Sequence, residues 1–458
     1  MQNLILNTDS YKTSHYVQYP EGAEIVSSYI ESRGGDYAET LMFGLQAFIK
    51  QYLTKPISAD DIDEAEALLT AHGVPFNREG WEYILNACGG YLPIEIQAVP
   101  EGTLLPVGNV MVQVKNTDPE CAWLTSYIET ALLRAVWYPT TVATVSKACK
   151  TIINRYLDET AENSDGLGFK LHDFGARGAS SEETAALGGA AHLVNFMGTD
   201  TISGLVLARR FYGADMPGFS IPAAEHSTIT SWGKEGESAA YANMLKQFGG
   251  EERLVAVVSD SYDLWNAIDN IWGESLKEQI ENMGGTLVVR PDSGDPLEVV
   301  PEALERLMAK FGYTTNSKGY RVLPDCVRLI QGDGVSVASI EAILAALKER
   351  AISADNIAFG MGGELLQKVN RDTQKFAMKA SAIRINGQWQ DVFKDPITDP
   401  GKRSKRGRLA LIKQADGYQT IREDELGSQA NELVTVFRNG DVLVNWTFDE
   451  IRERAAQR

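Results

Sequence analysis

Cysteine and histidine are both scarce in this sequence. Among 458 residues there are four cysteines and five histidines. The cysteines are far apart, with no CxxC pair and no histidine at the spacing of a metal ligand, so neither a zinc site nor a disulfide framework is indicated. We expect buried thiols in a reducing compartment, for which the cytoplasm is the default. The four positions are Cys88, Cys121, Cys149 and Cys326.

Positive charge and long apolar runs are also in short supply. The 43 lysines and arginines are outnumbered by 62 aspartates and glutamates, which gives a formal net charge of −19. Such a surface repels the phosphates of nucleic acids and of anionic membranes, so neither is an expected partner. No apolar stretch approaches the roughly 20 residues of a membrane-spanning helix, and residues 1–16 carry no apolar secretory core. A P-loop is excluded too, because G-x-x-x-x-G-K-S/T occurs nowhere in the chain.

What is present is the composition of an ordinary globular protein, 44% hydrophobic and 23% charged. At this length we expect one large domain and a smaller one. Residues 1–165 mix helical patterns with short strands, residues 166–376 alternate regularly, and residues 377–458 return to strands and turns. We predict that the two terminal segments pack together as a second, β-rich α/β domain. Their patterns predict helices at 41–52 and 61–72, strands at 92–99 and 107–114, and a hairpin of 434–437 with 442–446.

The middle segment alternates short apolar runs with amphipathic helical patterns, which is typical of a parallel sheet covered by helices. Polar residues stand at the carboxyl end of each run. Such strand ends favour an irregular (β/α) barrel, which builds its active site from those loops, over an open doubly wound sheet with one switch point. The expected strands are 169–174, 219–223, 254–258, 286–289, 327–330 and 357–359. The expected helices are 181–196, 262–282, 297–310, 337–348 and 365–371.

Two glycine clusters close strands of this segment and suit phosphate binding. Gly362 and Gly363 let backbone N–H groups approach a phosphate, and the helix that follows adds a favourable dipole. Gly332 and Asp333 stand in the same place one β/α unit earlier. The alternative for each cluster is a plain strand-to-helix turn.

Charged residues follow three other strands. Arg290 and Asp292 flank a rigid proline, which suits oxyanions on one side and ribose hydroxyls or Mg²⁺ on the other. An internal salt bridge is the alternative. His226 opens a helix, where it is placed for proton or phosphoryl chemistry, although a lone histidine is often a core or surface residue. Asp260, at the next strand end, is predicted to hydrogen-bond the ring of His226.

An aromatic residue and an arginine lie three positions apart at the end of the expected strand 169–174. A flat heteroaromatic ligand would stack on Phe174 while Arg177 pairs with an anion, unless Phe174 simply packs in the core. Residues 402–408 form the only basic run of the chain. It is interpreted either as a solvated loop or as part of the entry for a polyphosphate.

Taken in order, these blocks resemble the nicotinamide phosphoribosyltransferases, a family of type II phosphoribosyltransferases, over almost the whole chain. The matching segments are 8–12 (TDSYK), 91–96 (YLPIEI), 116–121 (NTDPEC), 137–139 (WYP), 172–178 (HDFGARG), 198–201 (GTDT), 222–228 (PAAEHST), 258–263 (VSDSYD), 290–294 (RPDSG), 330–334 (IQGDG), 394–396 (KDP) and 448–452 (FDEIR).

The resemblance implies that nicotinamide reacts with phosphoribosyl pyrophosphate to give nicotinamide mononucleotide and pyrophosphate, in NAD salvage. It implies an irregular (β/α) barrel plus a β-rich domain from both terminal regions, and a head-to-tail homodimer whose active sites lie at the interface. It also implies Mg²⁺ carried mainly by the substrate phosphates. ATP is implied as the phosphoryl donor to His226, which would couple ATP hydrolysis to substrate capture.

Motif matching also carries the family's residue roles onto this chain. The predicted catalytic residues are His226, Asp260 and Asp292. Phe174 and Tyr11 from two subunits would sandwich the pyridine ring, and Asp200 would receive its carboxamide. Asp9 would reach the active site of the second subunit, with Arg33 as a further candidate. The predicted residues around the ribose phosphate are Arg290, Gly332, Asp333, Gly362, Gly363 and Arg371. Those on the pyrophosphate side are Arg177, Lys379 and Lys394.

Two departures from the family pattern change the expected phosphate contacts. Glu364 stands where the family can extend its glycine run, and Ala377 stands where it can have a serine. Two other functions stay open. Nicotinate phosphoribosyltransferase is the nearest enzyme, and residue 200 discriminates it. A non-catalytic binding or signalling role is the other, and a turnover assay separates it.

Overall fold

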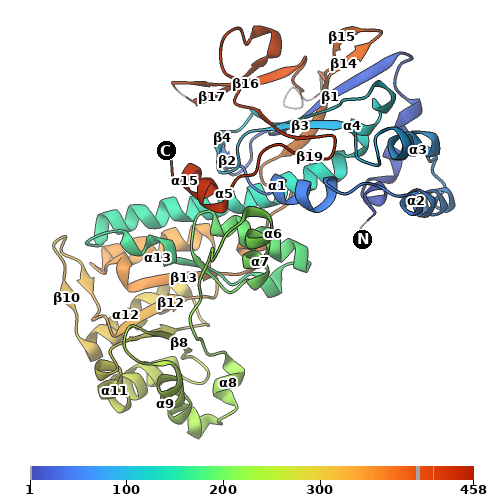
Figure 1. The fold of residues 1–458 in the computed structure, drawn as a ribbon. Coiled ribbons are helices and arrows are strands. Elements are labelled where there is room, and N and C mark those ends of the chain that lie inside the picture. Colours follow the sequence, from blue (N-terminus) through green and yellow to red (C-terminus); the bar gives the residue numbers. More distant parts are fainter. Residues whose placement is uncertain (1–2, 399–402, 416, 458) are drawn as a thin grey trace. The chain divides into compact units, whose positions relative to one another are not determined.

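The computed structural model describes residues 3–398, 403–415 and 417–457, so Lys402 of the basic run lies outside the described part. Two compact units are present (Figure 1). The first comprises Met1–Thr144, Leu207–Ala214 and Asn370–Arg458, and the second comprises Val145–Val206 and Asp215–Val369. Helix α5 (Glu129–Thr160) contributes residues to both units. Within the described residues, no helix is long and apolar enough to cross a membrane.

The first unit is built on a seven-stranded antiparallel sheet with the order β15-β14-β1-β5-β3-β18-β19. Its central strand β1 (Ala23–Ser32) pairs with β14 (Phe376–Ile385) and with β5 (Val110–Asn116), so the two ends of the chain are hydrogen-bonded in one sheet. The other strands are β3 (Ile94–Ala98), β15 (Gln388–Asp391), β18 (Val434–Arg438) and β19 (Asp441–Val442). Two small sheets join β2 (Glu39–Leu41) to β4 (Leu104–Pro106) and β16 (Leu409–Gln414) to β17 (Gly417–Arg422).

Most of the helices and strands expected in the two terminal segments are present. The hairpin is confirmed, because β18 and β19 pair across Asn439 and Gly440, which both have positive φ as a tight turn requires. The expected helix 41–52 begins only at residue 45: Gly44, at φ 104°, separates β2 from α1 (Leu45–Phe48), which continues as a π-helical turn, Ile49–Leu53. The remaining helices of this unit are α2 (Ala59–His72), α3 (Arg78–Ala87), α4 (Leu124–Tyr127) and α15 (Phe448–Ala456).

The second unit contains a curled six-stranded parallel sheet with the order β7-β6-β13-β12-β9-β8. The expected strands correspond to β6 (Leu171–Asp173), β8 (Leu254–Val258), β9 (Thr286–Arg290), β12 (Val327–Gln331) and β13 (Ile357–Met361), and β7 (Gly198–Thr199) is added. A short ribbon of β10 (Thr314–Thr315) and β11 (Arg321–Val322) lies apart from this sheet. Because all six strands are parallel, their carboxyl ends meet at one edge.

Residues 219–223 differ from the prediction in an informative way. They do not form a regular strand, since Pro222 has no N–H to donate to a ladder. Instead Phe219 bridges Gly198 on β7 and Ala223 bridges Ala256 on β8. The segment therefore joins the two edges of the sheet, which gives the irregular barrel that the sequence predicted.

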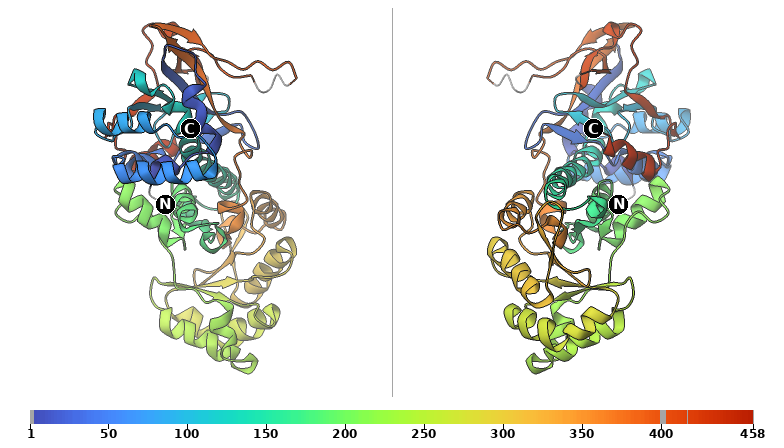
Figure 2. Two further views of the ribbon diagram at one scale, coloured as in Figure 1. Left: turned by 90° about the vertical axis from the view of Figure 1, so that its right-hand side faces the viewer. Right: turned by 90° about the vertical axis from the view of Figure 1, so that its left-hand side faces the viewer.

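Helices flank this barrel. Helices α12 (Pro296–Phe311) and α13 (Val337–Glu349) lie side by side along it, and both are visible as the yellow-to-orange pair in Figure 2. The expected helix 262–282 is interrupted by a π-helical stretch, Ala267–Ser275, and the expected helix 365–371 is only α14 (Gly363–Leu366). The other helices are α6 (Glu182–Leu193), α7 (Ile202–Tyr212), which runs into the first unit, α8 (His226–Thr230), α9 (Glu237–Phe248), α10 (Leu264–Asn266) and α11 (Lys277–Asn282).

Candidate active site

The ring of Phe174 packs directly on the backbone of Gly360 and Gly332, which carry no side chain. A Cβ built on Gly360, in β13, would stand only 2.0 Å from Cε2 of Phe174, and one on Gly332 would stand 3.4 Å from the same atom. The ring also packs against the apolar cluster of Ala256, Val288 and Ile330. Phe174 is half-buried, so one part of it stays open to a ligand. Sequence reasoning missed the role of Gly360, although a glycine inside a strand is a signal of close approach.

Asp200 follows β7 and is exposed. Its backbone N–H donates to the carbonyl of Asp173 over 2.9 Å. Its carboxylate accepts a hydrogen bond from the hydroxyl of Ser220, a partner that the sequence did not indicate. His172 lies on the same side of the sheet as Phe174, with 6.2 Å between the ring centroids. Burial lowers the pKa of His172, although the nearby Asp200 charge acts to raise it, so this ring favours its neutral form.

His226 and two carboxylates form a network at neighbouring strand ends. The predicted hydrogen bond is present, since Nε2 of His226 lies 3.0 Å from Oδ1 of Asp260. The other ring nitrogen, Nδ1, lies 3.9 Å from a carboxylate oxygen of Asp292. Oδ2 of Asp260 accepts from the backbone N–H of Asp292 at 3.0 Å and from the hydroxyl of Ser293. Asp260 therefore fixes both the histidine ring and the loop that carries Asp292, while the histidine side chain remains 46% exposed.

Arg290 and Asp292 lie side by side, with 3.8 Å between a guanidinium nitrogen and a carboxylate oxygen. The Nε atom of Arg290 is buried and has no hydrogen-bond partner among the described residues. A Cβ on Gly332 would lie 3.5 Å from Oδ1 of Asp292, so the glycine stands between Phe174 and this pair. The pair is thus close enough for the salt bridge that the sequence left open, while both side chains stay partly accessible to a ligand. It leaves donor capacity for an anion.

The Arg177 loop packs on the glycine turn after β13. A Cβ on Gly178 would meet the Cα of Gly363 at 3.5 Å, and one on Gly175 would meet the carbonyl oxygen of Gly362 at 2.9 Å. Arg177 itself is exposed. The structure thus brings an arginine beside backbone that is open at Gly363, where no atom lies within 4 Å of the missing side chain.

Asp333 follows β12 in the second unit and is exposed. The other predicted residues belong to the first unit. Tyr11 is 61% exposed, and the carboxylate of Asp9 accepts a hydrogen bond from Thr130. Burial lowers the pKa of Lys379, and the charges of Arg33, Lys12 and Lys394 lower it further, against the opposing effect of Glu129. Arg371 is exposed and lies 3.2 Å from Asp372. These cations gather on one unit, and a polyphosphate would relieve their mutual repulsion.

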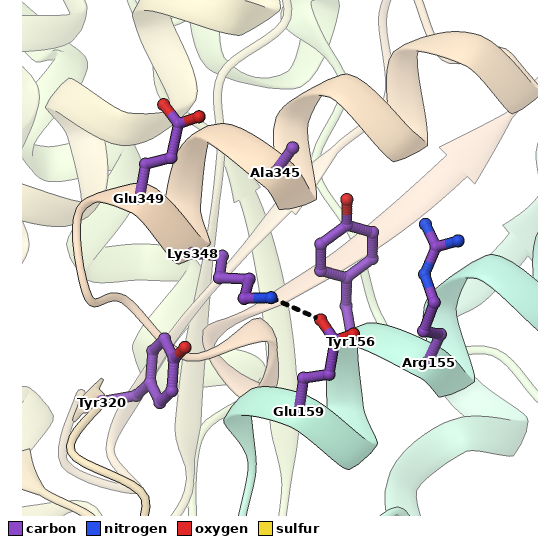
Figure 3. A pocket seen from close by; sticks show the side chains of 7 residues that line it. All are labelled: Arg155, Tyr156, Glu159, Tyr320, Ala345, Lys348 and Glu349. Atoms are coloured by element: carbon purple, nitrogen blue, oxygen red, sulfur yellow. Dashed lines mark hydrogen bonds and ion pairs between the residues drawn. The ribbon is translucent and has the colours of Figure 1, made fainter.

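A hollow of about 530 Å³ lies elsewhere in the second unit, between α5 and α13 (Figure 3). It contains none of the predicted site residues. Its cations are already paired, Lys348 with Glu159 at 2.9 Å and Arg155 with Glu341. It therefore suits an anionic substrate poorly, and the strand ends remain the candidate active site. No group of three or more His, Cys, Asp and Glu side chains in the described parts of the chain is arranged to hold a metal ion.

Comparison with known proteins identifies the class of enzyme. Residues 169–441 match the nicotinate phosphoribosyltransferase (NAPRTase) family, and residues 3–96 match the N-terminal domain of nicotinamide phosphoribosyltransferase. The chain belongs to the NAPRTase family and is a phosphoribosyltransferase, an enzyme that transfers a pentosyl group.

Within that family the similar curated proteins are nicotinamide phosphoribosyltransferases. The one from Xanthomonas campestris is 55% identical over 99% of this chain and 98% of its own length. The one from Acinetobacter baylyi is 33% identical over 98% of this chain and 96% of its own length. The fold is shared with nicotinate-nucleotide pyrophosphorylase from Pyrococcus furiosus, at a TM-score of 0.63, 16% identity and coverage of 99% and 95%. Human nicotinic acid phosphoribosyltransferase shares the fold too, at a TM-score of 0.57 and 17% identity, with coverage of 98% of this chain and 92% of its own.

Proposed function

We propose that this enzyme transfers the 5-phosphoribosyl group of phosphoribosyl pyrophosphate to nicotinamide, giving nicotinamide mononucleotide and pyrophosphate for NAD biosynthesis. The observation that carries the proposal is the arrangement at the strand ends. A Cβ on Gly332 would contact both an open aromatic ring, Phe174, and the carboxylate of Asp292, which lies beside Arg290. The names of the curated relatives support the choice of substrates.

The proposed reaction needs positioning and charge more than a base. The pyridine nitrogen attacks C1 of the ribose with its own lone pair, and the bond from C1 to the pyrophosphate oxygen breaks. Phe174 would hold the pyridine ring in line with C1 by stacking. Asp292 would face the positive charge that develops on the sugar, while Arg290 and Arg177 would stabilise phosphate oxygens.

Asp200 is proposed to select the amide over the acid. Its exposed carboxylate is fixed by Ser220 and accepts a hydrogen bond from a carboxamide NH₂. Nicotinate would bring a second negative charge to the same place, which is repulsive. Nicotinate transfer remains the second candidate, because the family matched by residues 169–441 is named for it.

Mg²⁺ is proposed as a cofactor held mainly by the substrate. Its chemistry would be to neutralise the departing diphosphate. Asp260 has both carboxylate oxygens engaged, by His226 and by the 292–293 loop, so it has little capacity for a metal. Asp292 and Asp333 each follow a strand end and stay open to solvent, so their carboxylates would be the ones to hold such an ion together with phosphate oxygens and water.

ATP is proposed to phosphorylate His226. The ring nitrogen not bonded to Asp260 would attack the γ-phosphorus, and the bond from that phosphorus to the ADP oxygen would break. The added charge would lie beside Asp292 and change how the site holds pyrophosphate. With γ-labelled ATP, the parent should give an acid-labile phosphoenzyme, and His226→Ala should give none. Equal labelling of the two proteins would refute this role.

A homodimer with shared active sites is proposed as the working form. Tyr11 and Val17 of the N-terminal segment are 61% and 68% exposed, and Ile202 and Val206 of α7 are 72% and 57% exposed. Exposed apolar side chains of this kind favour burial against a second copy. We also propose the cytoplasm as the compartment, supported by four free cysteines.

The function is tested by turnover. Incubation with phosphoribosyl pyrophosphate and nicotinamide should give nicotinamide mononucleotide and pyrophosphate in equal amounts. Asp292→Ala should remove the activity without preventing folding, because Asp292 is partly exposed. No product under any condition that preserves the fold would favour a non-catalytic role.

A further inference from the structure

Asp173 is a buried carboxylate that the proposed reaction does not use. It is the last residue of β6 and is 0% exposed. Alternate residues of a strand face opposite sides of the sheet. Asp173 therefore shares a face with the fully buried Leu171, and Phe174 and His172 point to the other face. A ligand stacked on Phe174 would not touch this carboxylate.

Asp173 is nevertheless bonded to both elements of the proposed pyridine site. Its Oδ1 accepts a hydrogen bond of 2.7 Å from the N–H of Gly175, which fixes the turn directly after Phe174. Its carbonyl oxygen accepts the N–H of Asp200 at 2.9 Å, which fixes the start of the turn into α7. Asp173 thus holds the loop with the aromatic ring through its carboxylate, and the loop with Asp200 through its main chain.

The second carboxylate oxygen is in an unusual state for a buried atom. Oδ2 of Asp173 and the hydroxyl of Thr201 are both buried and lack a hydrogen-bond partner within the described residues. The hydroxyl lies close enough to favour the ionised carboxylate, but the two atoms do not reach hydrogen-bond geometry. Burial raises the pKa of Asp173 to about 6, helped by the charge of Asp200 and opposed by the Gly175 N–H. Such incomplete pairing costs stability.

We propose that Asp173 is a positioning residue for nicotinamide, whose carboxylate places the Phe174 loop from the covered face of the sheet. The inference rests on the proposed pyridine site. The ionised carboxylate holds the Gly175 N–H more strongly than a neutral group does, because charge-assisted hydrogen bonds are about twice as strong. The charged group that faces it is Asp200, whereas His172 lies on the opposite face of the sheet.

The test compares the KM for nicotinamide with the KM for phosphoribosyl pyrophosphate. Asp173→Ala is expected to raise the KM for nicotinamide about ten-fold, because the loop after Phe174 loses the side-chain acceptor of the Gly175 N–H, while the KM for phosphoribosyl pyrophosphate changes less than about two-fold. Asp173→Asn keeps an acceptor for Gly175 and should recover most of the loss. Asn356→Ala is the matched control. It removes a fully buried polar side chain at the amino end of β13, and should lower the Tm without changing the KM for nicotinamide.

A pH series gives a second readout that does not need the alanine variant to fold. With saturating phosphoribosyl pyrophosphate, the parent's KM for nicotinamide should rise to that of Asp173→Asn as the pH falls below about 6, because both side chains are then neutral, and Asp173→Asn should show a flat profile. Equal changes in both KM values, or identical profiles for parent and Asp173→Asn, would overturn the inference.

Phe174→Ala distinguishes failure of the inference from failure of the site. If it raises the KM for nicotinamide while the Asp173 variants do not, the pyridine site stands and the positioning role is wrong. If Phe174→Ala leaves that KM unchanged, the site assignment itself is wrong, and the role of Asp173 is refuted with it.

Discussion

Gly360 is expected to be intolerant of a single added methyl group. Its missing Cβ would stand 2.0 Å from Cε2 and 2.2 Å from Cδ2 of Phe174. An ordinary contact begins at about 3.4 Å, so Gly360→Ala requires the ring to retreat by about 1.4 Å, the difference between 3.4 and 2.0 Å. A misplacement of about 1 Å can cost 10²-fold in rate. We therefore expect kcat/KM for nicotinamide to fall about 10²-fold.

The assay is steady-state kinetics with each substrate varied in turn. The KM for phosphoribosyl pyrophosphate should stay within about two-fold, because only the ring moves. Gly166→Ala is the matched control, since its Cβ would meet nothing closer than Lys170 Cε at 3.7 Å. It should behave as the parent.

A double-mutant cycle distinguishes displacement of the ring from general damage. In a Phe174→Ala background there is no ring to displace, so Gly360→Ala should add little further loss. Additive losses in the cycle would contradict displacement of the ring. So would a Gly360→Ala variant whose kcat/KM for nicotinamide stays within about two-fold of the parent's.

The remaining predictions concern Asp200, the shared site and Asp173. Asp200→Ser should raise the nicotinate-to-nicotinamide ratio of kcat/KM by about ten-fold or more, and an unchanged ratio with a lower Tm would leave only a structural role. Mixed under subunit exchange, inactive Tyr11→Ala and Asp292→Ala proteins should regain activity; no recovery despite proven exchange would mean that each site is built from one chain. The pKa of Asp173 is raised to about 6 from 3.8, so its contribution to stability is present below about pH 4 and is lost as the pH rises through 6. The Tm gain of Asp173→Asn over the parent should therefore be larger at pH 8 than at pH 5, and equal gains would contradict the raised pKa.

Local patterns predicted the regular parts of the barrel well. The apolar run at residues 254–258 and the strand β8 coincide, because a parallel strand covered on both faces needs continuous apolar residues. The same rule failed at 219–223, where Pro222 prevents a ladder and tertiary contacts with β7 and β8 take its place. The π-helical stretch Ala267–Ser275 was equally hidden, because its apolar pattern matches that of an α-helix.

The residue types of the candidate site were predictable, but only one of its side-chain contacts was. A carboxylate after one strand and a histidine after the previous one predicted the bond between Asp260 and His226, which is present. The hydroxyl partners, Ser293 on Asp260 and Ser220 on Asp200, come from loops whose approach depends on the whole barrel. The place of Gly360 beneath Phe174 depends on the pairing of β13 with β6, which no local pattern contains.

The central claim, that this enzyme uses nicotinamide, is tested most directly by competition. The parent protein is given phosphoribosyl pyrophosphate, Mg²⁺ and equal concentrations of nicotinamide and nicotinate, with and without ATP, and the two mononucleotides are separated and measured. Nicotinamide mononucleotide should be in large excess, because the Asp200 carboxylate would accept a hydrogen bond from the amide and repel the acid. An excess of nicotinate mononucleotide would contradict it.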